Sequence, residues 1–270
     1  MIQKALRKNW WTEKISVSDS EYRLKRIELF GTSGSGKSTI YNKLPCERLG
    51  VDKFHDLKMA VAMNYIENKF PFSSFNLGNA QLRKGLGSLV VRKSVQWMDK
   101  RVEKMCDDGP FQFPYSLFLP EQQYLIQCRK RKSILKRIAW FEYIQRINYK
   151  GMMLMDEGLV MASEEECLRY LPLTGLTAVV HLHCDFCDWY ERMRVRRYSG
   201  QVKGAKNIYK YSRQELSARF ERRRAIEDRK CDYLYSVGIP VLSLSTSDRA
   251  ERCINKVTEF VYQIRLTYVL

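Results

Sequence analysis

A glycine-rich segment between a β-type run and a helical run most constrains how this chain can fold. The segment consists of Gly31, Thr32, Ser33, Gly34, Ser35, Gly36, Lys37, Ser38 and Thr39. Its G-x-x-x-x-G-K-S pattern is that of a phosphate-binding loop, the Walker A motif. Glycines allow positive φ angles and a close approach of the backbone to a ligand, so that successive N–H groups can face one concavity. We therefore expect this segment to bind the phosphates of a nucleoside triphosphate.

Two side chains of the segment have individual predicted roles. Lys37 is expected to reach the β- and γ-phosphates, and the hydroxyl of Ser38 to hold Mg²⁺. Residues 27–30 form a short β-type run before the loop, and residues 40–44 continue helically after it. A glycine-serine turn with an incidental lysine is the alternative interpretation. The predicted strand before the segment and the predicted helix after it favour the interpretation as a phosphate-binding loop.

A second informative segment consists of four apolar residues, 152–155, that end in Asp156 and Glu157. Such a run predicts a buried parallel strand, and ligands bind at the carboxyl edge of a parallel sheet. We expect Asp156 to hold Mg²⁺, directly or through water, and Glu157 to take a proton from a phosphate acceptor or to orient the acceptor. A strand that simply runs into an acidic turn is the alternative, which the upstream loop disfavours.

A third strand is predicted at residues 177–183, and cysteines follow it. His181, His183, Cys184 and Cys187 carry side chains that ligate metals. A single C-x-x-C without a second ligand pair is weak evidence for a metal site. The pattern therefore favours a core strand.

Arginines are abundant in the helix predicted after this strand. Arg192 and Arg196 are four residues apart and share one helical face. A flexible basic stretch follows at residues 198–206. Such a loop can close over phosphates, exclude water and neutralise charge that develops in a transition state. We predict an arginine-rich lid at residues 192–213, with a solvated helix face as the alternative.

The order of predicted elements indicates an α/β protein with one domain. Residues 41–150 carry apolar residues at helical spacing and predict a mainly helical insert that holds the acceptor. A fourth strand at residues 238–244 and an amphipathic C-terminal helix follow. A chain of 270 residues with 45% hydrophobic residues can bury a sizeable core. We expect residues 1–270 to form a single domain.

The formal net charge of +17 implies negatively charged partners: phosphorylated substrates, nucleic acid or an anionic membrane surface. From the residues given we expect no secretory leader and no membrane-spanning segment, since no apolar run has the required length. The eight cysteines are scattered, which favours the cytoplasm. Residues 1–11 place Ile2, Leu6 and Trp10 near one helical face. Docking of this face on the core is favoured over peripheral membrane contact.

The loop at residues 31–38, the strand ending in Asp156 and Glu157, and the arginine-rich helix occur in a familiar order. This order resembles the P-loop small-molecule kinases, the nucleoside and nucleotide kinase group that includes adenylylsulfate-, gluconate- and shikimate-kinase-like enzymes. The resemblance spans residues 27–262. It implies a three-layer P-loop NTPase fold, with a mainly parallel sheet flanked by helices, a helical insert and an Arg-rich lid.

The same resemblance implies ATP and Mg²⁺ as cofactors and a lid whose arginines contact the transferred phosphate. By position these are Arg192, Arg196 and Arg197, and residues 243–248 lie near the adenine base. The nucleoside-kinase group often has an acidic-arginine pair where this chain has residues 156–158. This Asp-Glu-Gly turn resembles one in P-loop kinases associated with surface-polysaccharide synthesis.

The leading hypothesis is an ATP-dependent kinase that phosphorylates a hydroxyl or phosphate on a small molecule, nucleotide or glycan. Its catalytic residues are Lys37, Asp156, Glu157, Arg192 and Arg196. One alternative is an ATPase coupled to conformational or assembly work, although the chain has no ABC-type signature sequence. Another is a nucleic-acid-binding NTPase or polynucleotide kinase, motivated by the basic runs at residues 129–132 and 222–224.

Overall fold

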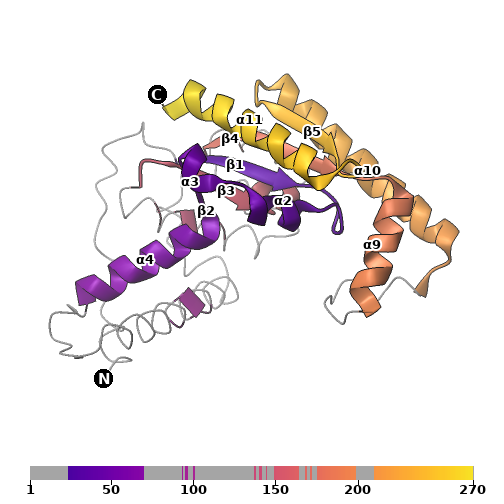
Figure 1. The fold of residues 1–270 in the computed structure, drawn as a ribbon, viewed down its shortest axis with the longest axis horizontal. Helices are drawn as coiled ribbons and strands as arrows, with labels where there is room; N and C mark the ends of the chain where they lie inside the picture. Colours follow the sequence, from indigo (N-terminus) through magenta and orange to yellow (C-terminus); the bar gives the residue numbers. More distant parts are fainter. Residues whose placement is uncertain are drawn as a thin grey trace, which may run out of the picture.

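A parallel β-sheet forms the centre of the protein (Figure 1). The computed structural model describes residues 24–69, 93, 95, 96, 100, 137, 140, 141, 144, 149–163, 168, 171, 175–198 and 210–269. Within these residues the strands are β1 (Lys25–Phe30), β2 (Val51–Lys53), β3 (Met152–Asp156), β4 (Leu176–His183) and β5 (Val241–Ser245). They pair in the order β2-β3-β1-β4-β5, and every pair is parallel.

Apolar residues on both faces explain why β3 and β4 lie inside the sheet. The first four residues of β3 are buried, as are the first seven of β4, which is typical of parallel strands covered by helices on both sides. The pairing of β1 with β3 places Leu29 beside Asp156. The end of β3 therefore lies next to the start of the phosphate loop, as predicted.

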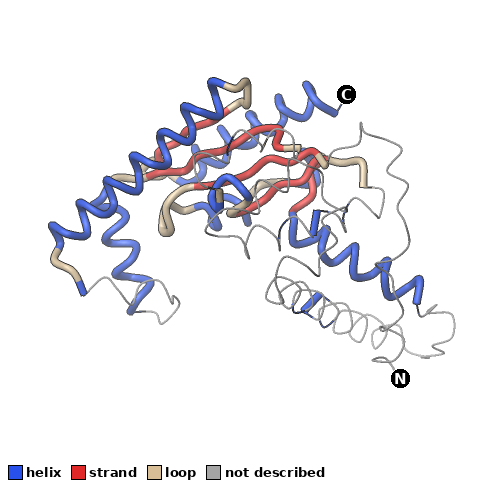
Figure 2. Tube along the Cα trace, turned by 180° about the vertical axis from the view of Figure 1, so that it is seen from behind, coloured by secondary structure: helices blue, strands red, loops and turns tan. Residues whose placement is uncertain are grey.

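Helices cover both faces, which gives three layers and confirms the predicted fold class (Figures 1 and 2). One face packs against α2 (Lys37–Lys43), α3 (Cys46–Leu49) and α11 (Ala250–Val269), through a cluster that includes Ile40, Leu49 and Val257. The other face packs against α4 (Phe54–Lys69), α8 (Leu159–Ala162) and α10 (Arg213–Ser236). The helix α9 (Phe186–Tyr198) and the adjoining end of α10 extend to one side of the sheet, and α4 extends to the other.

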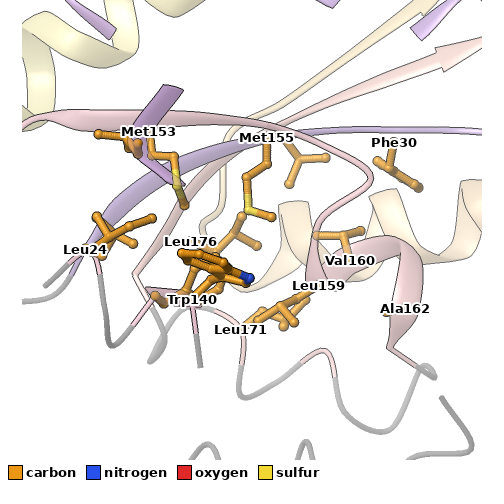
Figure 3. Packing of buried hydrophobic residues seen from close by; sticks show 14 of the residues in the cluster. Leu24, Phe30, Trp140, Met153, Met155, Leu159, Val160, Ala162, Leu171 and Leu176 are labelled. Atoms are coloured by element: carbon orange, nitrogen blue, oxygen red, sulfur yellow. The ribbon is translucent and has the colours of Figure 1, made fainter. Parts of the chain in front are cut away.

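The predicted insert contributes both to the core and to the sheet. Trp140 is buried and lies beneath the sheet with Met155, Leu171 and Leu176 (Figure 3). Phe141 and Ile144, two apolar residues of the predicted insert, are buried in the same cluster. The expectation of few strands between residues 41 and 150 missed β2, which completes the sheet beside β3.

Several expectations fall on residues outside the described ranges. These are the segment 1–11, most of the insert, and the lid loop at residues 199–209. Among the helices that the structure describes, none is long and apolar enough to cross a membrane.

Candidate functional site

The phosphate loop connects β1 to α2 and takes the conformation that its glycines permit. Gly31, Gly34 and Gly36 have φ angles of 144°, 96° and 89°, a region that side chains disfavour. Gly31 is also needed for space, since a Cβ there would lie 2.0 Å from the carbonyl oxygen of Leu182 in β4. The glycine pattern in the sequence therefore corresponds to real backbone requirements.

Lys37 lies over its own loop. Its side chain is 4% exposed, and Nζ donates to the carbonyl oxygens of Gly31 at 2.7 Å and Thr32 at 3.2 Å. Nζ also forms an ion pair with Oε1 of Glu157 at 3.5 Å. A lysine in this position presents a fixed positive charge at the end of the loop where β- and γ-phosphates bind in such motifs.

Ser38 and Asp156 meet at the start of α2. The hydroxyl of Ser38 donates to Oδ2 of Asp156 at 3.1 Å. The second oxygen, Oδ1, is buried and has no hydrogen-bond partner among the described residues. Burial raises the pKa of Asp156, and nearby Glu157 raises it further, whereas Lys37 and the bond from Ser38 act in the opposite direction.

This pair of oxygen ligands fits a magnesium ion. Mg²⁺ prefers carboxylate and hydroxyl oxygens and usually binds through one or two protein groups plus phosphates and water. A buried carboxylate oxygen without a partner is costly unless something satisfies it. A cation between Asp156, Ser38 and a phosphate would do so and would also favour the ionised carboxylate.

Glu157 has the one positive φ angle among described non-glycine residues, 58°. Its N–H donates to the carbonyl of Leu29 at 3.1 Å. Its own carbonyl accepts bonds from Nε and Nη2 of Arg137, at 2.9 and 2.6 Å. Left-handed backbone in a glutamate is uncommon, and such strain gathers at functional sites. The side chain is 51% exposed beside Lys37, where it can reach a ligand.

Gly158 completes this turn because a buried carboxylate occupies the space beside it. A Cβ on Gly158 would lie 2.2 Å from Cδ of Glu28. Glu28, fully buried in β1, accepts bonds from Nε of Arg26 and from the N–H of Val160, both at 2.7 Å. The first turn of α8 is thereby attached to the central strand. Neither Glu28 nor Arg137 was among the predicted site residues.

The helix α9 contacts the phosphate loop through backbone carbonyl oxygens of the loop. Nη1 of Arg192 lies 3.4 Å from the carbonyl oxygen of Gly34, and Nη1 and Nη2 donate to the hydroxyl and carbonyl of Thr246 at 2.8 and 2.6 Å. The indole of Trp189 donates to the carbonyl of Ser33 at 2.8 Å. Arg192 thus joins the phosphate loop to the segment after β5, which was predicted to lie near the adenine.

The other two predicted lid arginines follow Arg192 along α9. Arg196 lies one helical turn beyond Arg192 on α9, and the side chain of Arg197 is outside the described residues. Among the described residues no group of three or more side chains is placed to hold a metal, so the structure does not bring His181, His183, Cys184 and Cys187 together as such a set. His181 is instead a buried core residue that stacks on Phe30.

No family model matches the chain, and no curated protein sequence does. Among solved structures, the chain is similar to deoxyadenosine kinase from M. mycoides, solved with dCMP and dCDP, at 12% identity and a TM-score of 0.39, covering 88% of this chain and 99% of that one. It is also similar to TT1252 from Thermus thermophilus, at 18% identity and a TM-score of 0.35, covering 88% of this chain and 98% of that one. Similarities at this level assign no activity.

The molecule's own geometry defines its class. A parallel sheet in the order β2-β3-β1-β4-β5 carries a glycine loop after β1, a lysine and serine at the start of α2, and an aspartate at the end of the neighbouring strand. The chain has a three-layer α/β fold with a phosphate-binding loop of the P-loop NTPase type.

Proposed function

We propose that this protein is an ATP-dependent phosphotransferase whose acceptor is a small molecule, a nucleotide or a glycan. The observation that carries the proposal is the meeting of Lys37, Ser38, Asp156 and Glu157 at the carboxyl edge of the sheet. A lysine, a magnesium-binding pair and a second carboxylate are the groups that phosphoryl transfer from a triphosphate requires.

Each group has a distinct role in the proposed reaction. Lys37 binds the β- and γ-phosphates, and the N–H groups of the loop bind them from the backbone side. Ser38 and Asp156 would hold Mg²⁺, whose charge would offset that of the phosphate oxygens. Glu157 accepts the proton of the acceptor hydroxyl or orients that hydroxyl.

Arg192 and Arg196 remain the proposed lid arginines. Arg192 acts from the adenine side, because its guanidinium already bridges Gly34 and Thr246. Arg196, one turn further along α9, would approach the transferred phosphate when the lid closes.

The experiment that tests this proposal is a transfer assay with ATP labelled at the γ-phosphate. The acceptor panel contains nucleosides, nucleoside monophosphates, sugars and an oligonucleotide with a 5′-hydroxyl. Labelled product that requires Mg²⁺ and disappears in Lys37→Ala supports the proposal. Binding of ATP without transfer to any of these classes, together with hydrolysis in their absence, would favour the ATPase instead.

The ATPase is a second candidate because of one observation: Glu157 is half exposed beside Lys37, where it could also orient water. The variant Glu157→Gln separates the two functions. A hydrolase would lose acceptor-independent ATP turnover in this variant. A phosphotransferase would show little such turnover in the wild type and would lose transfer to the acceptor instead.

A further inference from the structure

A buried carboxylate lies directly behind the phosphate loop. Glu227 on α10 is 4% exposed, and its two oxygens accept from the hydroxyl of Thr32 at 3.0 and 3.1 Å. Nε2 of His181 lies 3.6 Å from Oε2, just beyond hydrogen-bond range. Burial acts to raise the pKa of Glu227, but the interactions with His181, Thr32 and Arg223 outweigh it and lower the pKa. A negative charge therefore lies next to a loop that binds anions.

A charge in this place opposes triphosphate binding unless a cation offsets it. Arg223, one helical turn before Glu227, provides that cation. Its Nε lies 3.3 Å from Oε1, the same oxygen that Thr32 contacts at 3.0 Å. The guanidinium therefore lies within two hydrogen-bond lengths of the loop.

Arg223 has hydrogen-bond donors that its contact with Glu227 does not use. Its side chain is 45% exposed, and Nε forms its ion pair with Glu227. The two terminal nitrogens of Arg223 donate to none of the described residues. When Nε holds the guanidinium in place, the N–H groups of its two terminal nitrogens can still form a bidentate pair of hydrogen bonds with a phosphate.

The contacts of Lys37 indicate which phosphate this fork would meet. Nζ of Lys37 lies on the carbonyl of Thr32, and the lysine of this motif reaches the β- and γ-phosphates. Thr32 therefore lies at the end of the loop where the lysine meets the β- and γ-phosphates, and Arg223 approaches that end from α10 through Glu227.

We infer that Arg223 binds the terminal phosphate of the triphosphate, and that Glu227 is the positioning residue that holds Arg223 on the loop. This inference rests on the proposed function and adds a residue to it. The basic run at residues 222–224 then contains one phosphate-binding arginine. Arg222 serves as its neighbour for comparison, since its Nε donates to Ala218 of its own helix and its side chain is exposed.

Calorimetric titration with MgATP and with MgADP tests the inference on the full chain. Arg223→Gln should weaken MgATP binding about tenfold or more, the scale of a lost charge-assisted hydrogen bond, and leave MgADP binding unchanged. Arg222→Gln removes the same charge one residue away and should change neither. Equal affinities of Arg223→Gln and Arg222→Gln for MgATP would overturn the inference.

The double variant Arg223→Gln/Glu227→Gln separates phosphate binding from simple charge compensation. If Arg223 only offsets Glu227, removing both charges restores MgATP binding, and the inference is wrong. If Arg223 contacts the phosphate, the double variant stays weak for MgATP. Thermal unfolding checks the fold of each protein, and Arg223→Lys, which keeps the charge but loses the fork, replaces Arg223→Gln if that variant does not fold. A wild type that binds neither nucleotide would refute the proposed function itself.

Discussion

The hydroxyl of Ser38 donates to the carboxylate of Asp156 over 3.1 Å, although 118 residues separate the two in the chain. The parallel pairing of β1 with β3 brings them together, because Leu29 at the end of β1 lies beside Asp156. The sheet thus places the two oxygen ligands side by side. Preformed ligands of this kind reduce the ordering that binding requires.

Asp156→Asn should abolish most of the increase in ATP affinity that Mg²⁺ produces. The variant keeps the shape of the side chain but removes the charge that attracts the cation, so the affinity for Mg²⁺ in the presence of ATP should fall at least about 10–100-fold. Titration of ATP with and without Mg²⁺ measures this effect. Asp52→Asn, which changes an exposed aspartate of β2, should behave as wild type. An unchanged magnesium effect in Asp156→Asn would remove Asp156 from the site.

Gly31 and Gly238 allow the steric requirement for glycine in the phosphate loop to be tested against a control position. Both have positive φ angles, 144° and 82°. A Cβ on Gly31 would meet the Leu182 carbonyl at 2.0 Å, whereas nothing lies within 4 Å of one on Gly238. Gly31→Ala should therefore lose about 2–4 kcal/mol of unfolding free energy or fail to fold. Gly238→Ala should lose about 1 kcal/mol. Urea unfolding measures both, and equal losses would contradict the predicted clash.

The sequence was sufficient for the loop, β3 and Asp156 because their signals are local. Glycines at fixed spacing predict a phosphate-binding loop, and an apolar run that ends in a carboxylate predicts a buried strand. The strand β2 was missed because only three residues form it and Asp52 within it is exposed. It is a strand because β3 offers an edge for it to pair with.

Partners from distant parts of the chain could not be predicted. Glu227 stands in an arginine-rich helix that looks solvated in the sequence, yet it is buried against Thr32, 195 residues away. Arg137 has no motif around it, and its contact with the Glu157 carbonyl depends on how the insert packs. Contacts of this kind form only when distant parts of the chain pack together, so the spacing of residues in the sequence does not predict them.

At position 157, a glycine should give a more stable protein than an alanine does. Its φ angle of 58° costs a residue with a Cβ about 1 kcal/mol or more, and glycine avoids this strain. Both Glu157→Gly and Glu157→Ala lose the carboxylate, so their difference in unfolding free energy isolates the backbone term. Glu157→Gly should be the more stable variant and still lack transfer activity. Equal stability of the two would argue against a strained turn.

Glu227 should make the protein more sensitive to acid. Because its pKa in the folded protein is lowered from the ordinary glutamate value, the carboxylate stabilises the fold above that value. This stability is lost as the pH falls through the lowered pKa. The difference in unfolding free energy between wild type and Glu227→Gln should therefore hold from neutral pH to about pH 5 and shrink as the pH falls below the ordinary glutamate pKa of about 4.3. A difference that stays constant or widens on acidification would contradict the lowered pKa.

The most direct test of the site is calorimetric titration of MgATP into the wild type and into Lys37→Ala. The wild type should bind one MgATP per chain. Lys37→Ala should bind it at least about tenfold more weakly, because the ammonium that meets the β- and γ-phosphates is gone. A wild-type protein that takes up no MgATP, or a Lys37→Ala variant that binds it equally well, would show that the loop at residues 31–39 is not a triphosphate site.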